Sequence, residues 1–491
     1  MKFLEVITDF LEKNVKTIFS YPGEQILPLY NEINGSNIKN IMVRDERGAG
    51  FMADGYARIT NYIGVCLVTA GPGSTNLTTP IANAYKDNSS VLAITGRCQK
   101  KYIGKNYFQE INMDFLNFYK GYFVDNADIN YIVDAFNNCL TNKKPVQLNI
   151  PVDLYKEETK DINTNAYIDI NKDDNEDTLN NINEINAKKP LFLIGQGIFG
   201  TLSYKEMLKI SKILQKINCP IATTFPARGV IDETYNNCIG LVGRRGDLKS
   251  LLGADKIINI GSSLSYNTYV ESVRKKLLSK TLTINLKPKN IKELKEFFDN
   301  LNVENNNFIN KNSNKFSPCG DYSSKINEII KNIPEDSIIV TDAGKHTVFT
   351  CLLKTCVIPR NIISSHSFGA MGFGLPATIG VKFGTIDFNI DREVVLISGD
   401  GGFLMNIEEL QVVSEYNLKI LMAVFKNNSL AEFCKIKNPN FNKIADAFGI
   451  DNCYIEKADE ISSTIKDYLK KDKPLLMVVE TKNEPLPKPN I

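Results

Sequence analysis

The chain has 491 residues, enough for roughly three domains of about 150 residues that each bury a core. Its 58 Lys and Arg against 56 Asp and Glu leave a net charge of +2, which argues against a nucleic-acid-binding surface. The chain has two histidines and no tryptophan. Two histidines cannot supply a site that needs three imidazoles, such as a His₃ zinc centre. We therefore expect small molecules or copies of the same chain as partners, and no nucleic acid.

The N-terminal segment predicts an amphipathic helix and not a targeting sequence. Phe3, Ile7 and Phe10 share one helical face, but Glu5 and Asp9 interrupt them, which the apolar core of a signal peptide would not tolerate. No stretch approaches the roughly 20 apolar residues of a membrane span. The ten cysteines include no C-x-x-C pair. We expect a cytoplasmic protein that does not bind a membrane.

Short apolar segments alternate with amphipathic ones along the chain, which is typical of doubly wound α/β domains. Two stretches rich in Asn, Asp and Lys, about 157–187 and 298–326, are predicted as linkers. The sequence thus predicts three α/β domains with parallel sheets, over 1–158, 186–300 and 322–491. Predicted strands are 65–69, 91–95 and 146–150 in the first domain, 190–197, 220–225, 256–261 and 281–286 in the second, and 337–344, 394–402, 420–425 and 475–480 in the third.

Polar residues follow two predicted strands of the third domain. Gly399-Asp400-Gly401-Gly402 ends one strand, and Asn427 follows the next. Parallel strands end at one edge of a sheet, where such folds bind ligands. The glycines permit close approach to a phosphate, and Asp400 offers a hard oxygen to a divalent cation. Either segment alone is an ordinary turn, but the two together indicate a phosphate and metal site.

Between these two segments, the sequence predicts a helix over 406–417. Asn406 and Glu409 are three residues apart, as the N-cap and N3 residues of a capping box are, and Leu410 and Val413 follow at helical spacing.

A charged opening and a run of small residues characterise 44–58 in the first domain. Taken alone, Asp45, Glu46 and Arg47 read as a solvated helix start, where acidic side chains suit the helix dipole. The small residues at helical spacing favour close helix packing, either within the chain or between subunits.

Together, these segments resemble the thiamine diphosphate enzymes. The Gly-Asp-Gly run, followed by Asn427 after an apolar strand, is similar to the cofactor motif of that family, and 44–58 resembles its pyrimidine-binding helix. The resemblance runs through essentially the whole chain and implies the architecture of pyruvate oxidase and decarboxylase. It implies thiamine diphosphate and Mg²⁺ as cofactors, with Asp400, Asn427 and the carbonyl of Ser429 as metal ligands.

The same resemblance implies a catalytic role for Glu46, whose carboxyl would hydrogen-bond the aminopyrimidine ring of the cofactor. Segments 21–24, 70–77, 342–346 and 365–380 resemble other cofactor loops, although Lys345 stands where relatives often carry Gln. The cofactor-binding residues implied in this way are Pro22, Gly23, Pro72, Asn76, Gly344, His346, Gly369, Met371, Gly399, Gly401, Gly402, Asn427, Ser429 and Leu430.

Within the family, the sequence is most similar to the acetolactate synthase large subunit. Phe108-Gln109-Glu110 resembles a segment of those enzymes in which the glutamine lies near the reacting centre. Glu24, in contrast, stands where synthases usually carry glycine, and it would relay a proton and favour aldehyde release. The segment after Asn428, including Ala431 and Glu432, is shorter than in synthases and lacks their substrate-selecting tryptophan.

The leading hypothesis is therefore decarboxylation of a 2-oxo acid, with pyruvate as the first candidate, followed by carboligation as in acetolactate synthase and branched-chain amino acid biosynthesis. A simple 2-oxo acid decarboxylase, another carboligase and a non-catalytic homologue are the alternatives. The segments 241–246 and 261–265 match FAD-binding loops only in part, so FAD binding stays open. The resemblance implies a homodimer or homotetramer with shared active sites, and leaves a regulatory subunit open.

Overall fold

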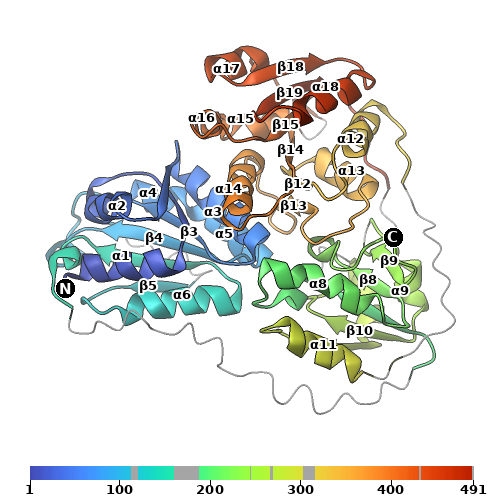
Figure 1. Cartoon of the computed structure of the whole chain (residues 1–491), viewed down its shortest axis with the longest axis horizontal. Coiled ribbons are helices and arrows are strands. Elements are labelled where there is room, and N and C mark those ends of the chain that lie inside the picture. Colours follow the sequence, from blue (N-terminus) through green and yellow to red (C-terminus); the bar gives the residue numbers. More distant parts are fainter. Residues whose placement is uncertain are drawn as a thin grey trace.

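The computed structural model describes residues 1–111, 120–159, 187–243, 245–265, 269–301, 303, 316–430 and 433–488. Three parallel sheets, each flanked by helices, confirm the predicted fold class. In Figure 1 the first domain lies at the left, the second at the lower right and the third at the top. The strands of each sheet come from one of the three predicted ranges. The exact domain boundaries stay predictions, because most of the predicted linker residues lie outside the described part.

The first sheet has six strands in the order β2-β1-β3-β4-β6-β5, and all of its pairs are parallel. Its central strands are buried throughout because helices cover both faces, which explains their continuous apolar runs. The elements are α1 (Phe3–Asn14), β1 (Thr17–Ser20), η1 (Glu24–Ile26), α2 (Leu27–Asn34), β2 (Lys39–Met42), α3 (Glu46–Thr60), β3 (Gly64–Val68), α4 (Pro72–Asn76), α5 (Thr78–Asp87), β4 (Val91–Arg97), η2 (Lys100–Tyr102), β5 (Lys120–Phe123), α6 (Asn130–Asn142), β6 (Val146–Pro151) and η3 (Leu154–Lys156).

The second sheet has five parallel strands in the order β11-β10-β7-β8-β9. Its longest helix, α8, begins with a capping box between Ser203 and Glu206 and buries one apolar face. The elements are β7 (Pro190–Ile194), η4 (Gln196–Phe199), α8 (Tyr204–Leu214), β8 (Ile221–Thr223), η5 (Phe225–Ala227), β9 (Cys238–Leu241), α9 (Lys249–Gly253), β10 (Lys256–Ile260), α10 (Glu271–Leu278), β11 (Thr281–Ile284) and α11 (Ile291–Asp299).

The third sheet has six parallel strands in the order β13-β12-β14-β15-β19-β18, and a small antiparallel pair, β16 and β17, lies outside it. The elements are α12 (Asp321–Asn332), β12 (Ile338–Thr341), α13 (Lys345–Leu353), β13 (Ile362–Ser364), α14 (Gly374–Asp387), β14 (Val394–Gly399), α15 (Asp400–Leu404), η6 (Ile407–Glu409), α16 (Leu410–Glu415), β15 (Leu421–Lys426), β16 (Ser429–Leu430), β17 (Cys434–Lys435), α17 (Phe441–Ala447), β18 (Asp451–Ile455), α18 (Glu460–Leu469) and β19 (Leu475–Glu480).

The predicted strands are all present, with ends that differ by a few residues, but the sheets also contain strands that the hydrophobic pattern did not reveal. Most of these are short strands at or beside a sheet edge, and their three to five residues carry too little of the hydrophobic pattern to be recognised. They are β1, β2, β5, β9, β13 and β18, together with the small pair β16 and β17.

Helices α3 and α14 pack against each other and join the first domain to the third. A Cβ atom added to Gly55 would collide with the backbone of Ala377, and one added to Gly380 would collide with the backbone of Met52. The small residues of α3 therefore serve close packing within the chain. The start of α3 carries Glu46, so this contact sets where that carboxyl lies relative to the third domain.

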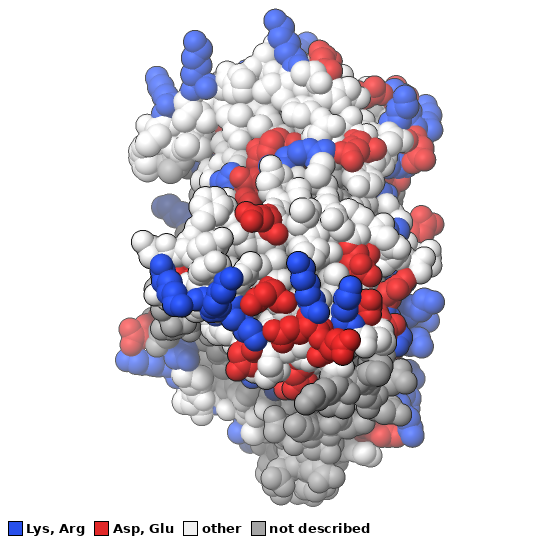
Figure 2. Space-filling view, turned by 90° about the vertical axis from the view of Figure 1, so that its left-hand side faces the viewer, with Lys and Arg blue, Asp and Glu red and all other residues white. Residues whose placement is uncertain are grey.

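Charged side chains of both signs are interspersed over the described part of the face in Figure 2, in keeping with the net charge of +2. Within the described residues, no helix is both long enough and apolar enough to cross a bilayer. All ten cysteines are free thiols.

Candidate active site

Asp400 and Asn427 meet at the carboxyl edge of the third sheet. Strands β14 and β15 are parallel neighbours with Gly399 opposite Phe425, so the residues that follow them emerge side by side. Asp400 is only 2% exposed, and its Oδ2 accepts hydrogen bonds from the backbone N–H groups of Asn427 at 3.1 Å and Asn428 at 2.8 Å. Its Oδ1 accepts from the N–H of Gly401 at 2.9 Å. The carboxylate is thus held in one orientation.

Asn438 is a member of this cluster that the sequence did not reveal. Its Nδ2 donates to Asp400 Oδ2 at 2.7 Å and to Asn428 Oδ1 at 2.9 Å. Its own Oδ1 is buried and accepts no hydrogen bond from the described residues. No strand or helix carries Asn438, and only folding brings it to Asp400.

The oxygen atoms at this edge fit a hard divalent cation. Asp400 contributes a carboxylate and Asn427 an amide oxygen, which accepts from the N–H of Ser429 at 3.1 Å and so lies close to that residue. The buried, unpaired Oδ1 of Asn438 adds an oxygen that lacks a positive partner. Oxygen ligands of this kind suit Mg²⁺ or Ca²⁺ better than zinc. Among the described residues, no group of three or more His, Cys, Asp and Glu gathers as a metal centre, either here or elsewhere.

Glycine loops and His346 lie next to this edge. Gly369 has φ +72° and nothing within 4 Å of an added Cβ, so its loop leaves open space beside the backbone. An added Cβ on Gly399 would lie 3.4 Å from Cε1 of His346, and one on Gly344 would lie 2.5 Å from the same atom. Nε2 of His346 lies 2.8 Å from the carbonyl oxygen of Asp342. Burial lowers the pKa of His346 to about 4, so its ring is neutral at pH 7.

Met371 and Leu430 lie over the glycines that follow β14. Cε of Met371 would be 3.5 Å from a Cβ on Gly401, and Leu430 would collide with that Cβ. Met371 is 37% exposed, an unusual position for a methionine that only fills a core. An added Cβ on Gly402 would lie 2.7 Å from Cγ of Asp342, so glycine is needed there for packing.

Asp342 holds the loop that carries Met371, a role that we had not predicted. Its carboxylate accepts from the N–H groups of Gly372 at 3.1 Å and Gly374 at 2.9 Å. Complete burial raises the pKa of Asp342 to about 6, against the lowering effect of these hydrogen bonds. A sequence signal for this role existed, because Asp342 directly follows a buried strand, as Asp400 does.

Glu46 begins helix α3, after Asp45, whose side chain caps the helix by accepting from the N–H of Arg47 at 2.8 Å. Oε2 of Glu46 accepts from Nδ2 of Asn76 at 2.9 Å. An added Cβ on Gly73 would lie 3.4 Å from its Oε1. The structure therefore brings Glu46 together with helix α4, which opens with Pro72 at its first turn and ends at Asn76.

The predicted capping box of Asn406 and Glu409 is wrong. Residues 407–409 form a 3-10 turn before α16, and Asn406 makes no capping hydrogen bond. Instead, Nδ2 of Asn406 donates to the carbonyl of Gly372 at 2.7 Å. The carboxylate of Glu409 accepts from the backbone N–H groups of Arg44 and Asp45, both at 3.1 Å. Tertiary partners thus replace the local capping contacts.

This turn therefore joins the two predicted parts of the site. Asn406 contacts the residue after Met371, and Glu409 contacts the two residues before Glu46. Glu409 is fully buried, and this burial raises its pKa to about 8. Within the described part of the chain, no hydrogen bond joins Glu46 directly to Asp400 or Asn427.

The remaining predicted residues lie at the carboxyl edge of the first sheet. Gln109 has φ +60°, and its carbonyl would be 2.6 Å from a Cβ on Gly71, directly before α4. Pro22 and Gly23 lead into the turn η1, where Glu24 is exposed. An added Cβ on Gly23 would collide with Thr69, which places this loop beside the end of β3.

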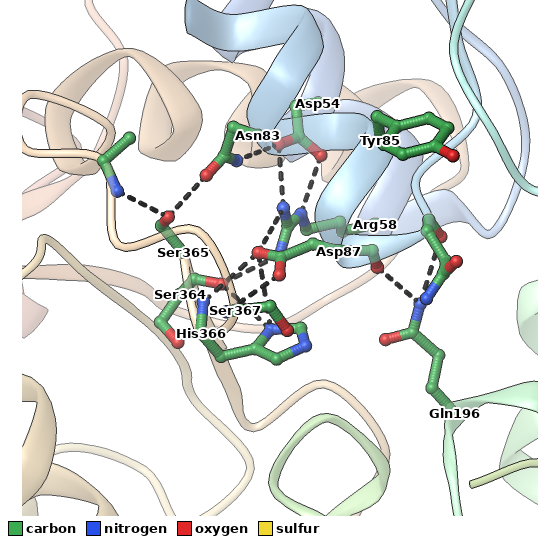
Figure 3. A network of polar contacts seen from close by, with 12 residues as sticks. Asp54, Arg58, Asn83, Tyr85, Asp87, Gln196, Ser364, Ser365, His366 and Ser367 are labelled. Atoms are coloured by element: carbon green, nitrogen blue, oxygen red, sulfur yellow. Dashed lines mark hydrogen bonds and ion pairs between the residues drawn. The ribbon is translucent and has the colours of Figure 1, made fainter. Parts of the chain in front are cut away.

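His366 takes part in a different cluster, where all three domains meet. Arg58 of α3 pairs with Asp54 at 2.7 Å and with Asp87 at 3.1 Å, and it donates to the carbonyl of Ser364 at 2.8 Å. Nδ1 of His366 lies 3.5 Å from Asp87 Oδ2, and Nε2 of Gln196 donates to the carbonyl of Asp87 at 2.9 Å (Figure 3). Burial lowers the pKa of His366. The contacts of His366 are thus those of a satisfied interdomain residue.

The segment compared with an FAD-binding loop, 261–265, forms a turn that groups of η4 and β10 hold. The carbonyl of Gly261 accepts from Gly197 N–H at 2.9 Å, and the carbonyl of Ser262 accepts from Asn259 Nδ2 at 2.8 Å. In the other compared segment, Arg244 lies outside the described residues, as do Ala431 and Glu432 after β16.

Three family models match the chain in order. They are "Thiamine pyrophosphate enzyme, N-terminal TPP binding domain" over 1–118, "Thiamine pyrophosphate enzyme, central domain" over 184–298 and "Thiamine pyrophosphate enzyme, C-terminal TPP binding domain" over 342–479. The first and last of these contain Glu46 and Asp400, respectively.

Relatives also match along nearly the whole chain. An uncharacterized protein of Methanocaldococcus jannaschii is 85% identical over 491 residues, which are 100% of this chain and 99% of that protein. The acetolactate synthase large subunit of Buchnera aphidicola from Acyrthosiphon pisum is 30% identical, covering 87% of this chain and 82% of that protein. A probable acetolactate synthase large subunit of M. jannaschii is 28% identical over 97% of this chain and 91% of that protein.

Solved structures share the fold. The benzoylformate decarboxylase of Polynucleobacter necessarius has a TM-score of 0.85 at 16% identity, covering 99% of this chain and 100% of that chain. A putative thiamin diphosphate-dependent enzyme of Mycobacterium smegmatis has a TM-score of 0.81 at 19% identity, covering 98% of this chain and 100% of that chain. With the family models and the synthase relatives, these likenesses show that the chain belongs to the thiamine pyrophosphate enzyme family, close to the acetolactate synthase large subunits.

Proposed function

We propose that the protein decarboxylates a 2-oxo acid, with pyruvate as the first candidate, and joins the remaining carbonyl carbon to a second carbonyl compound. The observation that carries this proposal is a pair of carboxylates that neighbouring groups orient. Hydrogen bonds from Asn427 and Asn438 hold Asp400, and a hydrogen bond from Asn76 holds Glu46. When bound, thiamine diphosphate supplies the carbon nucleophile and the electron sink for breaking the bond to the carboxylate carbon.

Each part of the site has a role in this proposal. Asp400, Asn427 and the carbonyl of Ser429 would hold Mg²⁺ against the diphosphate. The loop of Gly369 leaves open space for phosphate oxygens beside its backbone. The loops of Gly344, Gly399, Gly401 and Gly402 would line the diphosphate, and the neutral ring of His346 adds no charge there. Met371 and Leu430 would support the rings of the cofactor from the same side.

Glu46 would hold a proton at its carboxyl for the aminopyrimidine ring. Nδ2 of Asn76 donates a hydrogen bond of 2.9 Å to the Glu46 carboxyl and so orients it. Gln109 and the loop of Pro22 and Gly23 lie at the same sheet edge, where they would face the substrate.

Replacement of the Glu46 carboxyl tests the mechanism. Glu46→Gln keeps the shape and the contact with Asn76 but holds no transferable proton, so we expect release of carbon dioxide from pyruvate to fall at least 100-fold. Glu296→Gln, on the exposed face of α11, is the matched control and should leave the rate unchanged. An unchanged rate in the Glu46 variant would reject this role.

A simple 2-oxo acid decarboxylase is the second candidate. Glu24 is exposed at the edge of the site, where it could deliver a proton and release an aldehyde. In addition, M. jannaschii has both the 85% identical relative and a separate probable acetolactate synthase large subunit, so two such proteins occur in one organism. Product analysis with pyruvate separates the candidates, because acetolactate supports the synthase and acetaldehyde the decarboxylase. Addition of FAD in a parallel reaction tests whether the flavin has any effect.

A homodimer or homotetramer with shared sites is part of the proposal. The direct contacts of Glu46 and of Asp400 lie in different domains, and no hydrogen bond joins the two residues within the described chain. A cofactor between two subunits would bring such groups together. Sedimentation with activity measurement tests this, because a fully active monomer would reject shared sites. Calorimetry that detects no binding of thiamine diphosphate with Mg²⁺ would favour a non-catalytic homologue.

A further inference from the structure

A cavity of about 330 Å³ opens at the carboxyl edge of the first sheet. Its lining includes Gly71 after β3, Arg97 at the end of β4, Asn149 in β6, and Gln109 and Phe123. The volume lies within the range of sites that bind small molecules, and the carboxyl edge of a parallel sheet is where α/β domains bind ligands.

Arg97 is the cationic residue of this lining, and among the described residues its guanidinium has no anion as a partner. Cζ of Arg97 lies 5.4 Å from the ring centroid of Phe123, which holds the guanidinium by a cation–π contact. Its carbonyl accepts from the N–H of Val152 at 3.1 Å, so the backbone is anchored. Across the described residues, no hydrogen bond or ion pair engages the guanidinium itself. A half-buried arginine in this state offers its planar set of donors to a carboxylate.

The acidic group in the same lining is engaged elsewhere. Oε1 of Glu110 accepts from the N–H of Gly104 at 3.3 Å, and no ion pair joins Glu110 to Arg97 in the described structure. Both charges act on Cys98, which lies between them in the lining: burial raises the pKa of that thiol, Glu110 raises it further and Arg97 lowers it. An anion in the cavity would therefore be attracted to the Arg97 side.

The cavity shares a wall with the candidate active site. The carbonyl of Gln109 would lie 2.6 Å from a Cβ on Gly71, and Gly71 directly precedes α4, which holds Asn76 against Glu46. We propose that Arg97 binds a carboxylate group of the substrate that the product retains, which makes it a specificity-determining residue. This inference rests on the proposed function, because it assigns part of a 2-oxo acid to this cavity.

The chemistry decides which carboxylate Arg97 binds. When the bond between the carbonyl and carboxylate carbons breaks, its electron pair stays on the carbonyl carbon and neutral carbon dioxide leaves. An ion pair to the departing carboxylate would stabilise the ground state more than the transition state and would slow this step. Arg97 is suited to a carboxylate that keeps its charge, either on the acceptor 2-oxo acid or at the far end of a dicarboxylic donor.

A binding experiment tests the site without any turnover. Succinate, which cannot be decarboxylated here, is titrated into the full chain by ligand-observed NMR, and neutral succinamide serves as the uncharged probe. We expect succinate to bind more tightly than succinamide, and Arg97→Gln to weaken succinate binding at least tenfold. Lys101→Gln, an exposed neighbour outside the lining, is the control and should bind succinate as the unchanged protein does. Absent succinate binding, or equal binding in Arg97→Gln, would overturn the site even if the enzyme is active.

Turnover experiments then identify the source of the carboxylate. With 2-oxoglutarate as donor, a KM increase of tenfold or more in Arg97→Gln places the distal carboxylate at Arg97. With pyruvate as donor, the same increase only for a carboxylated acceptor, and not for an aldehyde acceptor, places the acceptor there. An equal increase in the KM for pyruvate as donor, measured with an aldehyde acceptor, would mean that Arg97 holds the departing carboxylate and would overturn the inference. Arg97→Lys retains the charge and should give an intermediate KM, so it is used where the glutamine variant does not fold. Lack of turnover in the unchanged protein rejects the proposed function, whereas succinate binding reports on Arg97 independently.

Discussion

The two carboxylates of the candidate site are held very differently. Asp400, at the edge of the third sheet, accepts hydrogen bonds from four donors, three of them backbone N–H groups. Glu46, at the edge of the first sheet, is half-buried, and among the described residues it accepts from a single side chain, Asn76. A metal ligand benefits from a rigid orientation, whereas a group that holds and moves a proton needs a free oxygen. The difference in hydrogen bonding therefore matches the difference in proposed role.

The largest effect is expected from Asp400→Asn. The amide would direct an N–H group at a backbone N–H group, that of Gly401 in the better of its two orientations, which costs about 1–3 kcal/mol in the free energy of unfolding. The lost charge should weaken Mg²⁺-dependent binding of thiamine diphosphate by about 1,000-fold, as calorimetry would measure. Asp467→Asn, exposed on α18, is the control. Unchanged cofactor affinity would remove Asp400 from the metal site.

Glu409→Gln should change how stability depends on pH, because Glu409 lies between the two regions. Burial raises the pKa of Glu409 from 4.5 to about 8, so the folded state keeps a proton that the unfolded state has lost. The stabilisation is complete below the unfolded pKa and is lost as pH rises toward 8.

Glutamine imitates the protonated carboxyl and does not titrate. The variant should therefore gain about 2–3 kcal/mol relative to the unchanged protein between pH 6 and 8, since one proton over one pH unit is worth about 1.4 kcal/mol. Asp45 and Glu408, the acidic neighbours of Glu409, are present in both proteins. Urea denaturation across this range measures the difference, and parallel stability curves would contradict the prediction.

Asn438→Ala tests how much of the rigidity at Asp400 comes from outside its own loop. The change removes the donor at 2.7 Å but leaves three backbone donors in place. We expect Mg²⁺ affinity to fall about tenfold, because partners of metal ligands set their orientation. Asn440→Ala, two residues away, caps α17 and serves as the control. If the two variants bind Mg²⁺ equally well, Asn438 does not support Asp400.

Asn76→Ala should have the smallest effect on stability. Asn76 is exposed, so its loss should change the free energy of unfolding by about 0.5 kcal/mol or less. It removes the only described donor to Glu46, and we expect kcat to fall severalfold while Mg²⁺ affinity stays constant. Thr75→Ala on the same helix is the control. A loss of Mg²⁺ affinity would show that the two edges are not independent.

Much of the candidate site followed from strand ends. Asp400 and Asn427 were expected together because each follows a strand of one parallel sheet, and their hydrogen bond is seen. The assignment of Glu46, in contrast, came from resemblance, because an acidic residue at a helix start is equally typical of a solvated surface. Short edge strands such as β5 and β18 escaped prediction, since four or five half-exposed residues have no distinct pattern.

The sequence by itself determined three parallel α/β domains and the sheet edges that carry Asp400 and Glu46. Both follow from local properties of the chain, namely the alternation of apolar and amphipathic segments and the residue types at the ends of strands. Only the tertiary structure decided the partners of Asn406, Glu409 and Asn438. Asn406 and Glu409 have the spacing of a helix cap. In the folded chain they instead form hydrogen bonds with backbone groups of other segments, which folding buries beside them. A buried polar group must find a partner wherever folding provides one, and chain order does not record where that is.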